Sequence, residues 1–221
     1  MVVTQTWQKI IVLVLAVLLV SFLVFLIVGV LSHDTSNPYY YVNSLDELKK
    51  VFKKEPDFLF PDLSKYDFIT TYMVGHKPTN KKILTSYSIG GSRTDGNWER
   101  SDSVLHELSI GCSKPKLLSN ESNPVRELDL NFEHLGVKMS EENYDISNTE
   151  GTISDQFPKG SFVFRYTYRF DLGDCRYGLN GLIVVLPDDL SNTDTDALIE
   201  QGKNELLKIA ESIIIQRSLE S

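Results

Sequence analysis

The residues of this chain best suited to catalysis or metal binding are its histidines and cysteines. No histidine is followed by another four residues on, so the zinc motif H-E-x-x-H is absent, and no phosphate loop, dinucleotide fingerprint or G-x-S-x-G motif occurs. His106 precedes Glu107 in an alternating segment, and neighbouring side chains of a strand point to opposite faces. The sequence therefore predicts no catalytic residue, no cofactor and no metal site, and it favours a partly buried strand position for His106. The histidines are His33, His76, His106 and His134.

A stretch near the C-terminus, from Asn192 to Glu200, has acidic and amide side chains that resemble a calcium-binding loop. Ala197 stands where such a loop needs glycine, and Lys203 stands where it needs a bidentate glutamate. Oxygen atoms of this kind are also typical of the start of a helix, where they accept hydrogen bonds from free backbone N–H groups. We therefore interpret the stretch as a helix cap.

The two cysteines, Cys112 and Cys175, are far apart in the sequence. A single pair in an oxidising compartment is most simply a disulfide, which would stabilise the fold by about 4 kcal/mol. A structural zinc site would need further ligands at regular spacing. We predict a disulfide between Cys112 and Cys175, with free buried thiols as the alternative.

An apolar stretch from Ile10 to Leu31 is interrupted only by Ser21 and Gly29. At about 1.5 Å per residue it is long enough to cross a hydrocarbon core of about 30 Å. A cleaved signal peptide is the alternative, but its apolar region is shorter and ends in a small-x-small site, which is missing here. The sequence predicts a short tail over residues 1–9, a transmembrane helix over 10–32, a linker over 33–43 and a folded domain over 44–221.

Flanking charges predict the orientation of this helix. Lys9 precedes it, whereas residues 32–46 contain neither Lys nor Arg. Because positive charge is retained on the cytoplasmic side, the N-terminus is expected in the cytoplasm and the C-terminal domain outside it. The chain would then be a single-pass protein of the cell membrane. Its expected partners are the lipid bilayer and an unidentified membrane or envelope protein.

Charge also limits the class of ligand. The formal net charge is −8, and Lys9 is the only charged side chain before Asp34, so the rest of the chain is more acidic still. Nucleic-acid phosphates require clustered Lys and Arg. Binding to nucleic acid is therefore not expected.

The rest of the chain predicts an α+β domain, an antiparallel sheet packed by a short N-terminal and a long C-terminal helix. Ser44 and Glu47 form a capping box before the first helix. Alternating segments predict strands, and Gly173-Asp174 predicts the turn of a hairpin. Strands are expected over 68–74, 82–89, 104–112, 127–132, 161–170 and 181–186. The stripe of the final helix consists of Leu198, Ile199, Leu206, Ile209, Ile213 and Ile214.

The alternation over residues 161–170 separates an aromatic face from a face that carries Arg165 and Arg169. The aromatic side chains could line a pocket for lipid or glycan, but their large burial energy favours a core face under the C-terminal helix. The two arginines could bind an anionic ligand. In an acidic protein, pairing with carboxylates across the sheet is the simpler interpretation.

Several segments together resemble a DUF4367-type domain of unknown function, found in membrane-tethered and secreted proteins of Gram-positive bacteria. The resemblance covers about Ser44 to Arg217 and is carried by the helix 45–51, the segment 58–61, the Tyr-rich hairpin and the closing helix around 205–213. It implies a curved antiparallel sheet packed by a C-terminal helix. It carries over no catalytic residue, and the two cysteines are not part of the family's pattern.

We therefore expect a non-enzymatic binding, sensing or envelope-maintenance module with an unknown ligand. One alternative is an envelope hydrolase or transferase, which would require some of Glu99, His106, Glu107 and His134 to converge in one cleft. Another alternative is a structural subunit of a membrane assembly, which would expose an apolar patch of several hundred Å².

Overall fold

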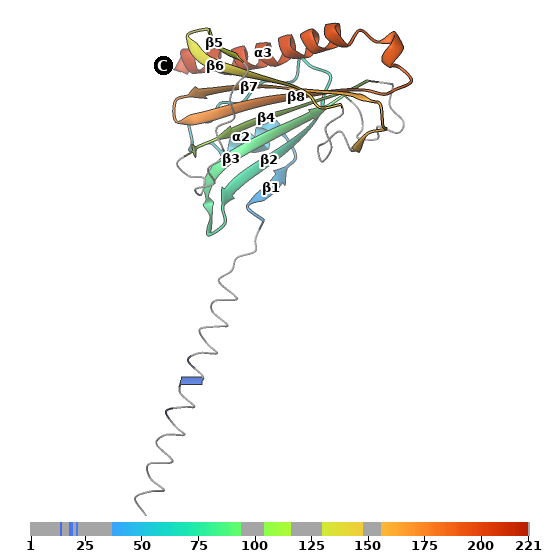
Figure 1. The fold of residues 1–221 in the computed structure, drawn as a ribbon. Helices are drawn as coiled ribbons and strands as arrows, with labels where there is room; N and C mark the ends of the chain where they lie inside the picture. Colours follow the sequence, from blue (N-terminus) through green and yellow to red (C-terminus); the bar gives the residue numbers. More distant parts are fainter. Residues whose placement is uncertain are drawn as a thin grey trace, which may run out of the picture. The chain divides into compact units, whose positions relative to one another are not determined.

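The computed structural model describes residues 37–93, 104–115, 130–147 and 156–220, together with Val14, Leu18, Leu19 and Ser21. The chain divides into two compact units, Met1–Asn37 and Pro38–Ser221. The elements described below all belong to the second unit, which Figure 1 shows as a twisted sheet with helices against it.

The predicted transmembrane helix over residues 10–32 needs correction. Within the described part of the chain, no helix combines the length and the apolar character that crossing a bilayer requires. Helix α2 (Leu45–Val51) is too short, since a span takes about 20 residues, and α3 (Thr195–Glu220) carries charged residues throughout. Apart from Val14, Leu18, Leu19 and Ser21, residues 10–32 lie outside the described residues.

Among the described residues, the sheet has eight strands, and every neighbouring pair is antiparallel. The spatial order β1-β2-β3-β4-β8-β7-β6-β5 means that two four-stranded meanders join along β4 and β8, so the last strand of each meander lies in the middle. The antiparallel sheet and its two helices agree with the sequence prediction. The strands are β1 (Tyr39–Val42), β2 (Ile69–Lys77), β3 (Asn80–Ser92), β4 (Val104–Ser113), β5 (Leu130–His134), β6 (Val137–Asp145), β7 (Phe162–Leu172) and β8 (Cys175–Val185).

The folded unit begins earlier than expected. The predicted linker contains Tyr39–Val42, which instead form β1 and pair with β2 from Tyr39↔Gly75 to Val42↔Tyr72. The capping box that follows is present, because Ser44 Oγ accepts a hydrogen bond from the Glu47 backbone N–H at 3.2 Å. The Glu47 carboxylate in turn accepts one from the Asn43 backbone N–H at 2.8 Å, one residue earlier than in the usual motif.

Helix α3 covers one face of the sheet and contacts β7 and β8 (Figure 1). The Asp194 carboxylate accepts a hydrogen bond from the Ala197 backbone N–H at 3.0 Å, which confirms the predicted cap. From Leu206 onward, the buried residues of α3 follow the predicted stripe, with Ala210 added, whereas Leu198 and Ile199 are only partly buried. The buried residues are Leu206, Ile209, Ala210, Ile213 and Ile214.

The aromatic side chains of β7 lie beneath α3, as predicted. Tyr166 is fully buried among them, and its ring fits because two glycines face it. A Cβ atom at Gly181 would lie 2.1 Å from Tyr166 Cζ, and one at Gly202 of α3 would lie 2.2 Å from Tyr166 Oη. These glycines therefore let the helix and β8 approach the ring closely.

Candidate binding surface

The two faces of the sheet differ in what packs against them. Both helices belong to the larger hydrophobic core cluster, together with the aromatic side chains of β7. On the opposite face the buried apolar residues form a smaller cluster at one end, made of Leu105, Val163, Leu182 and Val184 with Ile146 and Phe157 against it. Beyond that cluster, no described helix covers this second face, which we call the helix-free face.

The middle of the helix-free face is made of small side chains from three adjacent strands, β3, β4 and β8. A Cβ atom added at Gly178 would meet no described atom within 4 Å, and one at Gly111 would meet only backbone oxygens at 3.8 and 3.9 Å. No described side chain therefore stands over these positions. We call this group of six residues the small-residue floor. It consists of two rows of paired positions across the three strands, Ser88–Gly111–Gly178 and Gly90–Ser109–Asn180.

Polar side chains of β7 border the floor on one side. Thr167 Oγ1 donates a hydrogen bond to Asn180 Oδ1 at 2.9 Å, and the exposed Arg165 reaches the same oxygen at 3.4 Å. The Asn180 amide nitrogen makes no hydrogen bond to a described residue. On the β2 side, Thr71 and Met73 are the register partners of the floor residues of β3. The border thus offers hydrogen-bond donors beside a neutral floor.

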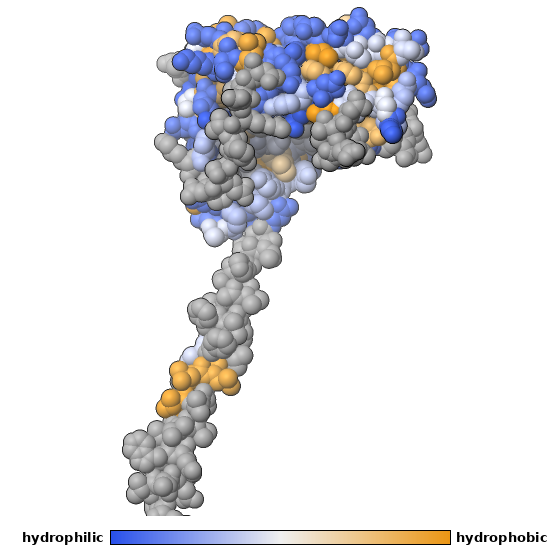
Figure 2. All heavy atoms as spheres, in the orientation of Figure 1, coloured by the Kyte–Doolittle hydropathy of each residue, from blue (hydrophilic) through white to orange (hydrophobic). Residues whose placement is uncertain are grey.

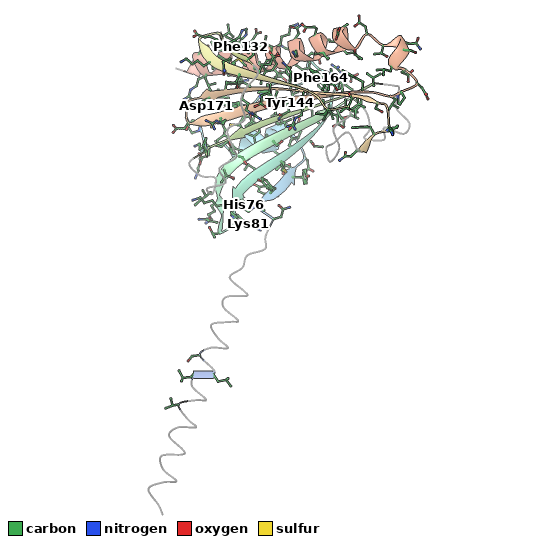
Figure 3. All side chains as sticks on the ribbon, in the orientation of Figure 1. His76, Lys81, Phe132, Tyr144, Phe164 and Asp171 are labelled. Atoms are coloured by element: carbon green, nitrogen blue, oxygen red, sulfur yellow. The ribbon has the colours of Figure 1, made fainter. Side chains whose placement is uncertain are left out.

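Arg169 and Arg165 differ in their partners. Arg169 forms an ion pair with Glu142, whose side chain is 1% exposed and which also accepts a hydrogen bond from Tyr144 Oη at 2.6 Å. Pairing across the sheet, predicted from sequence, therefore holds for Arg169. Arg165 forms no ion pair with a described residue. Figure 3 labels Tyr144 and Phe164 toward one end of β6 and β7, with Asp171 toward the other end of β7.

Glu107 of β4 lies on the helix-free face beside the floor. Partial burial raises the pKa of its carboxyl group, and no described residue forms a hydrogen bond or ion pair with it. The register places Leu182 between Glu107 and Arg165, so a carboxylate and a guanidinium flank one apolar residue without pairing. A half-buried carboxylate without a partner favours a ligand that donates hydrogen bonds.

His106 points to the other face, under α3. Its Nε2 lies 2.7 Å from Tyr166 Oη, and its Nδ1 lies 2.7 Å from Arg93 Nη1. Burial and, to a lesser degree, the positive charge of Arg93 lower the pKa of His106 to about 4, against the opposing effect of Glu205. The predicted strand position is confirmed. The residue is, however, only 8% exposed and therefore more deeply buried than the sequence indicated.

The residues of the predicted hydrolase cleft do not come together. His106 and Glu107 lie on opposite faces, and His134 on the edge strand β5 contacts Glu211 of α3 at 2.7 Å. Glu99 and His33 lie outside the described residues. His76 is buried in β2. Figure 3 shows it far from Phe132, which belongs to the same strand, β5, as His134. Among the described residues, no group of three or more His, Cys, Asp or Glu side chains is arranged to hold a metal ion.

The predicted disulfide is wrong, because Cys112 and Cys175 are both free and buried. In the register Cys112 lies opposite Tyr177, and Cys175 lies two residues before Tyr177 on the same strand. Such diagonal positions hold Cβ atoms about 7 Å apart, whereas a disulfide needs about 4 Å. The neighbouring Cys112 thiol and the positive charge of Lys114 lower the pKa of Cys175 against the effect of burial.

The alternative of a structural subunit predicts an exposed apolar patch, and no such patch is seen on the surface visible in Figure 2. Figure 2 shows mostly hydrophilic residues on the visible surface of the folded unit, with hydrophobic ones in small separate groups. This visible surface therefore gives no support to that alternative.

No family model, no curated protein and no solved structure matches this chain. The resemblance to DUF4367-type domains and the cell-membrane localisation therefore both stay predictions.

Proposed function

We propose that the folded unit is a non-enzymatic binding module and that its ligand contacts the helix-free face over the small-residue floor. The observation that carries this proposal is the open part of the floor at Gly111 and Gly178. It is bordered by the carboxylate of Glu107, which has no partner among the described residues, and by Arg165, which forms no ion pair with a described residue. Polar groups left half-buried without partners cost free energy that a ligand can recover.

The chemistry of the surface favours a hydroxyl-rich ligand, such as a saccharide chain. A sugar hydroxyl both donates and accepts hydrogen bonds, so one ligand can donate to Glu107 and accept from Arg165 and from the Asn180 amide. The net charge of −8 disfavours polyanions. The floor itself holds no large apolar side chain that would favour a lipid.

The size of the floor agrees with such a ligand. Three strands span about 10 Å, and two register rows extend about 7 Å along them. This is the scale of a short oligosaccharide lying on a surface.

Filling the floor tests the proposal. In Gly178→Val the added side chain should occupy the floor, and its Cβ would meet no described atom within 4 Å, so folding should be retained. The matched control is Asn131→Val, an exposed position in the same register row on the edge strand β5. Calorimetry with neutral tetrasaccharides of glucose and of N-acetylglucosamine should show binding to the wild type and to Asn131→Val.

The proposal predicts that Gly178→Val weakens this binding at least tenfold, the equivalent of about 1.4 kcal/mol. Glu107→Gln, which keeps the size of the side chain but removes its charge, should also weaken it. Equal affinity of Gly178→Val and the wild type, or no binding of any saccharide in the panel, would contradict the proposal.

A further inference from the structure

Four polar side chains from distant parts of the sequence are linked to one another between α3 and the sheet. Arg93 follows directly after β3, His106 belongs to β4, Tyr166 to β7 and Glu205 to α3. Arg93 Nη1 lies 2.7 Å from His106 Nδ1, and Arg93 Nη2 lies 2.5 Å from Glu205 Oε1. The guanidinium also stacks over the Phe68 ring, with 4.7 Å between Cζ and the ring centroid. Arg93 thus connects α3 to β4.

The hydrogen bond from Arg93 determines the protonation state of His106. A guanidinium group can only donate hydrogen bonds, so His106 Nδ1 must be the acceptor and the ring must be neutral. The ring proton then resides on Nε2, which donates to Tyr166 Oη at 2.7 Å. A protonated ring could not accept from Arg93 and would place two positive charges in contact.

An acceptor for the protonated ring is already present. Glu205 Oε2 is buried, has no hydrogen-bond partner among the described residues and lies 3.8 Å from His106 Nδ1. The Arg93 side chain is 30% exposed and can turn toward water. A small movement would therefore let Nδ1–H donate to Glu205 Oε2 in a charge-assisted hydrogen bond.

We propose that these residues form an acid-responsive latch on α3. When His106 takes up a proton from solvent, Nδ1–H donates to Glu205 Oε2, and Arg93 leaves the ring. Helix α3 is then connected to β4 directly, by the hydrogen bond between His106 and Glu205, and no longer through Arg93. This inference does not depend on the proposed binding function, because it concerns the opposite face of the sheet.

The charged groups around the ring agree with such a response. Arg93 from the end of β3 opposes protonation, Glu205 from α3 favours it, and Tyr166 from β7 is neutral because burial raises its pKa. Strand β8 presents Ile183 as the register partner of His106. The segment before β2 presents the Phe68 ring, 5.9 Å from the His106 ring, with Tyr66 against Phe68.

Nuclear magnetic resonance of the full chain between pH 7 and pH 3 tests the latch. The ring nitrogens of His106 report its protonation, and the Nε–H signal of Arg93 reports loss of its contacts. The latch predicts that both signals change with the same midpoint. Near-ultraviolet circular dichroism should show that tertiary structure persists through this change.

Two conservative variants separate the latch from simple burial. Arg93→Gln should raise the pKa of His106, and Glu205→Gln should lower it, because each removes one of the opposing charges. An Arg93 signal that does not follow His106, unchanged pKa values in both variants, or loss of tertiary structure at the same midpoint would each overturn the inference.

Discussion

At the scale of single residues, close packing decides what each glycine does. Gly202 in α3 and Gly178 in β8 look alike in the sequence, and neither has a positive φ. Gly202 faces the ring of Tyr166, whereas Gly178 faces open space on the helix-free face. Only the structure separates a glycine that packing requires from one that leaves a surface open.

This difference predicts opposite effects of the same substitution. Gly202→Ala should destabilise the fold by about 1–3 kcal/mol through overpacking against Tyr166, even though alanine favours a helix by about 1 kcal/mol. Gly178→Ala should leave stability unchanged or slightly raised, because glycine inside a strand is unfavourable. Urea unfolding of both variants measures the effect, and a Gly202→Ala protein as stable as the wild type would refute this packing argument.

Residue-level chemistry was only partly predictable from the sequence. Alternation correctly placed His106 and Glu107 on opposite faces of one strand. The sequence could not say that Cys112 and Cys175 meet diagonally, because that depends on the register between β4 and β8. Their wrong assignment as a disulfide came from the presence of a single pair and from the oxidising compartment expected for the domain.

At the scale of elements, clear periodicity gave correct predictions and mixed polarity did not. The aromatic alternation of β7 and the stripe of α3 were both found. Strand β6 was not predicted, because its core-facing positions include Glu141 and Asn143. Glu141 is tolerated there because Lys203 of α3 pairs with it at 2.7 Å, a contact that joins distant parts of the chain.

The buried stripe should account for most of the attachment of α3. Leu206 is 1% exposed, so Leu206→Ala should lower the free energy of unfolding by about 2–5 kcal/mol through loss of buried surface and formation of a cavity. On the same helix Ile215 is 48% exposed, and Ile215→Ala should change stability by less than about 1 kcal/mol. Chemical denaturation compares the two, and similar losses would indicate that the stripe is not the main contact.

At the scale of the whole molecule, the candidate surface arises from strand order. Ser88, Gly111 and Gly178 come from three strands and become neighbours only because β8 pairs with β4. Alternate small residues are visible in the sequence of β3, but nothing there indicates which strands lie beside it. The fold class was therefore accessible from the sequence, whereas the floor was not.

The whole fold should also be independent of any covalent cross-link. Because both thiols are free and buried, a reducing agent should not change the melting temperature. A thiol reagent such as Ellman's should react slowly with the native protein and with both cysteines after denaturation. A lower melting temperature under reducing conditions, or no reactive thiol in denaturant, would restore the disulfide.

The most direct test of the binding surface is amide chemical-shift mapping of the nitrogen-15-labelled chain during titration with a neutral tetrasaccharide. We predict that the largest changes fall on Ser88, Ser109, Gly111, Gly178 and Asn180, with Glu107 and Arg165 beside them. Changes concentrated on α3, or a spectrum unaffected by every saccharide, would contradict the account.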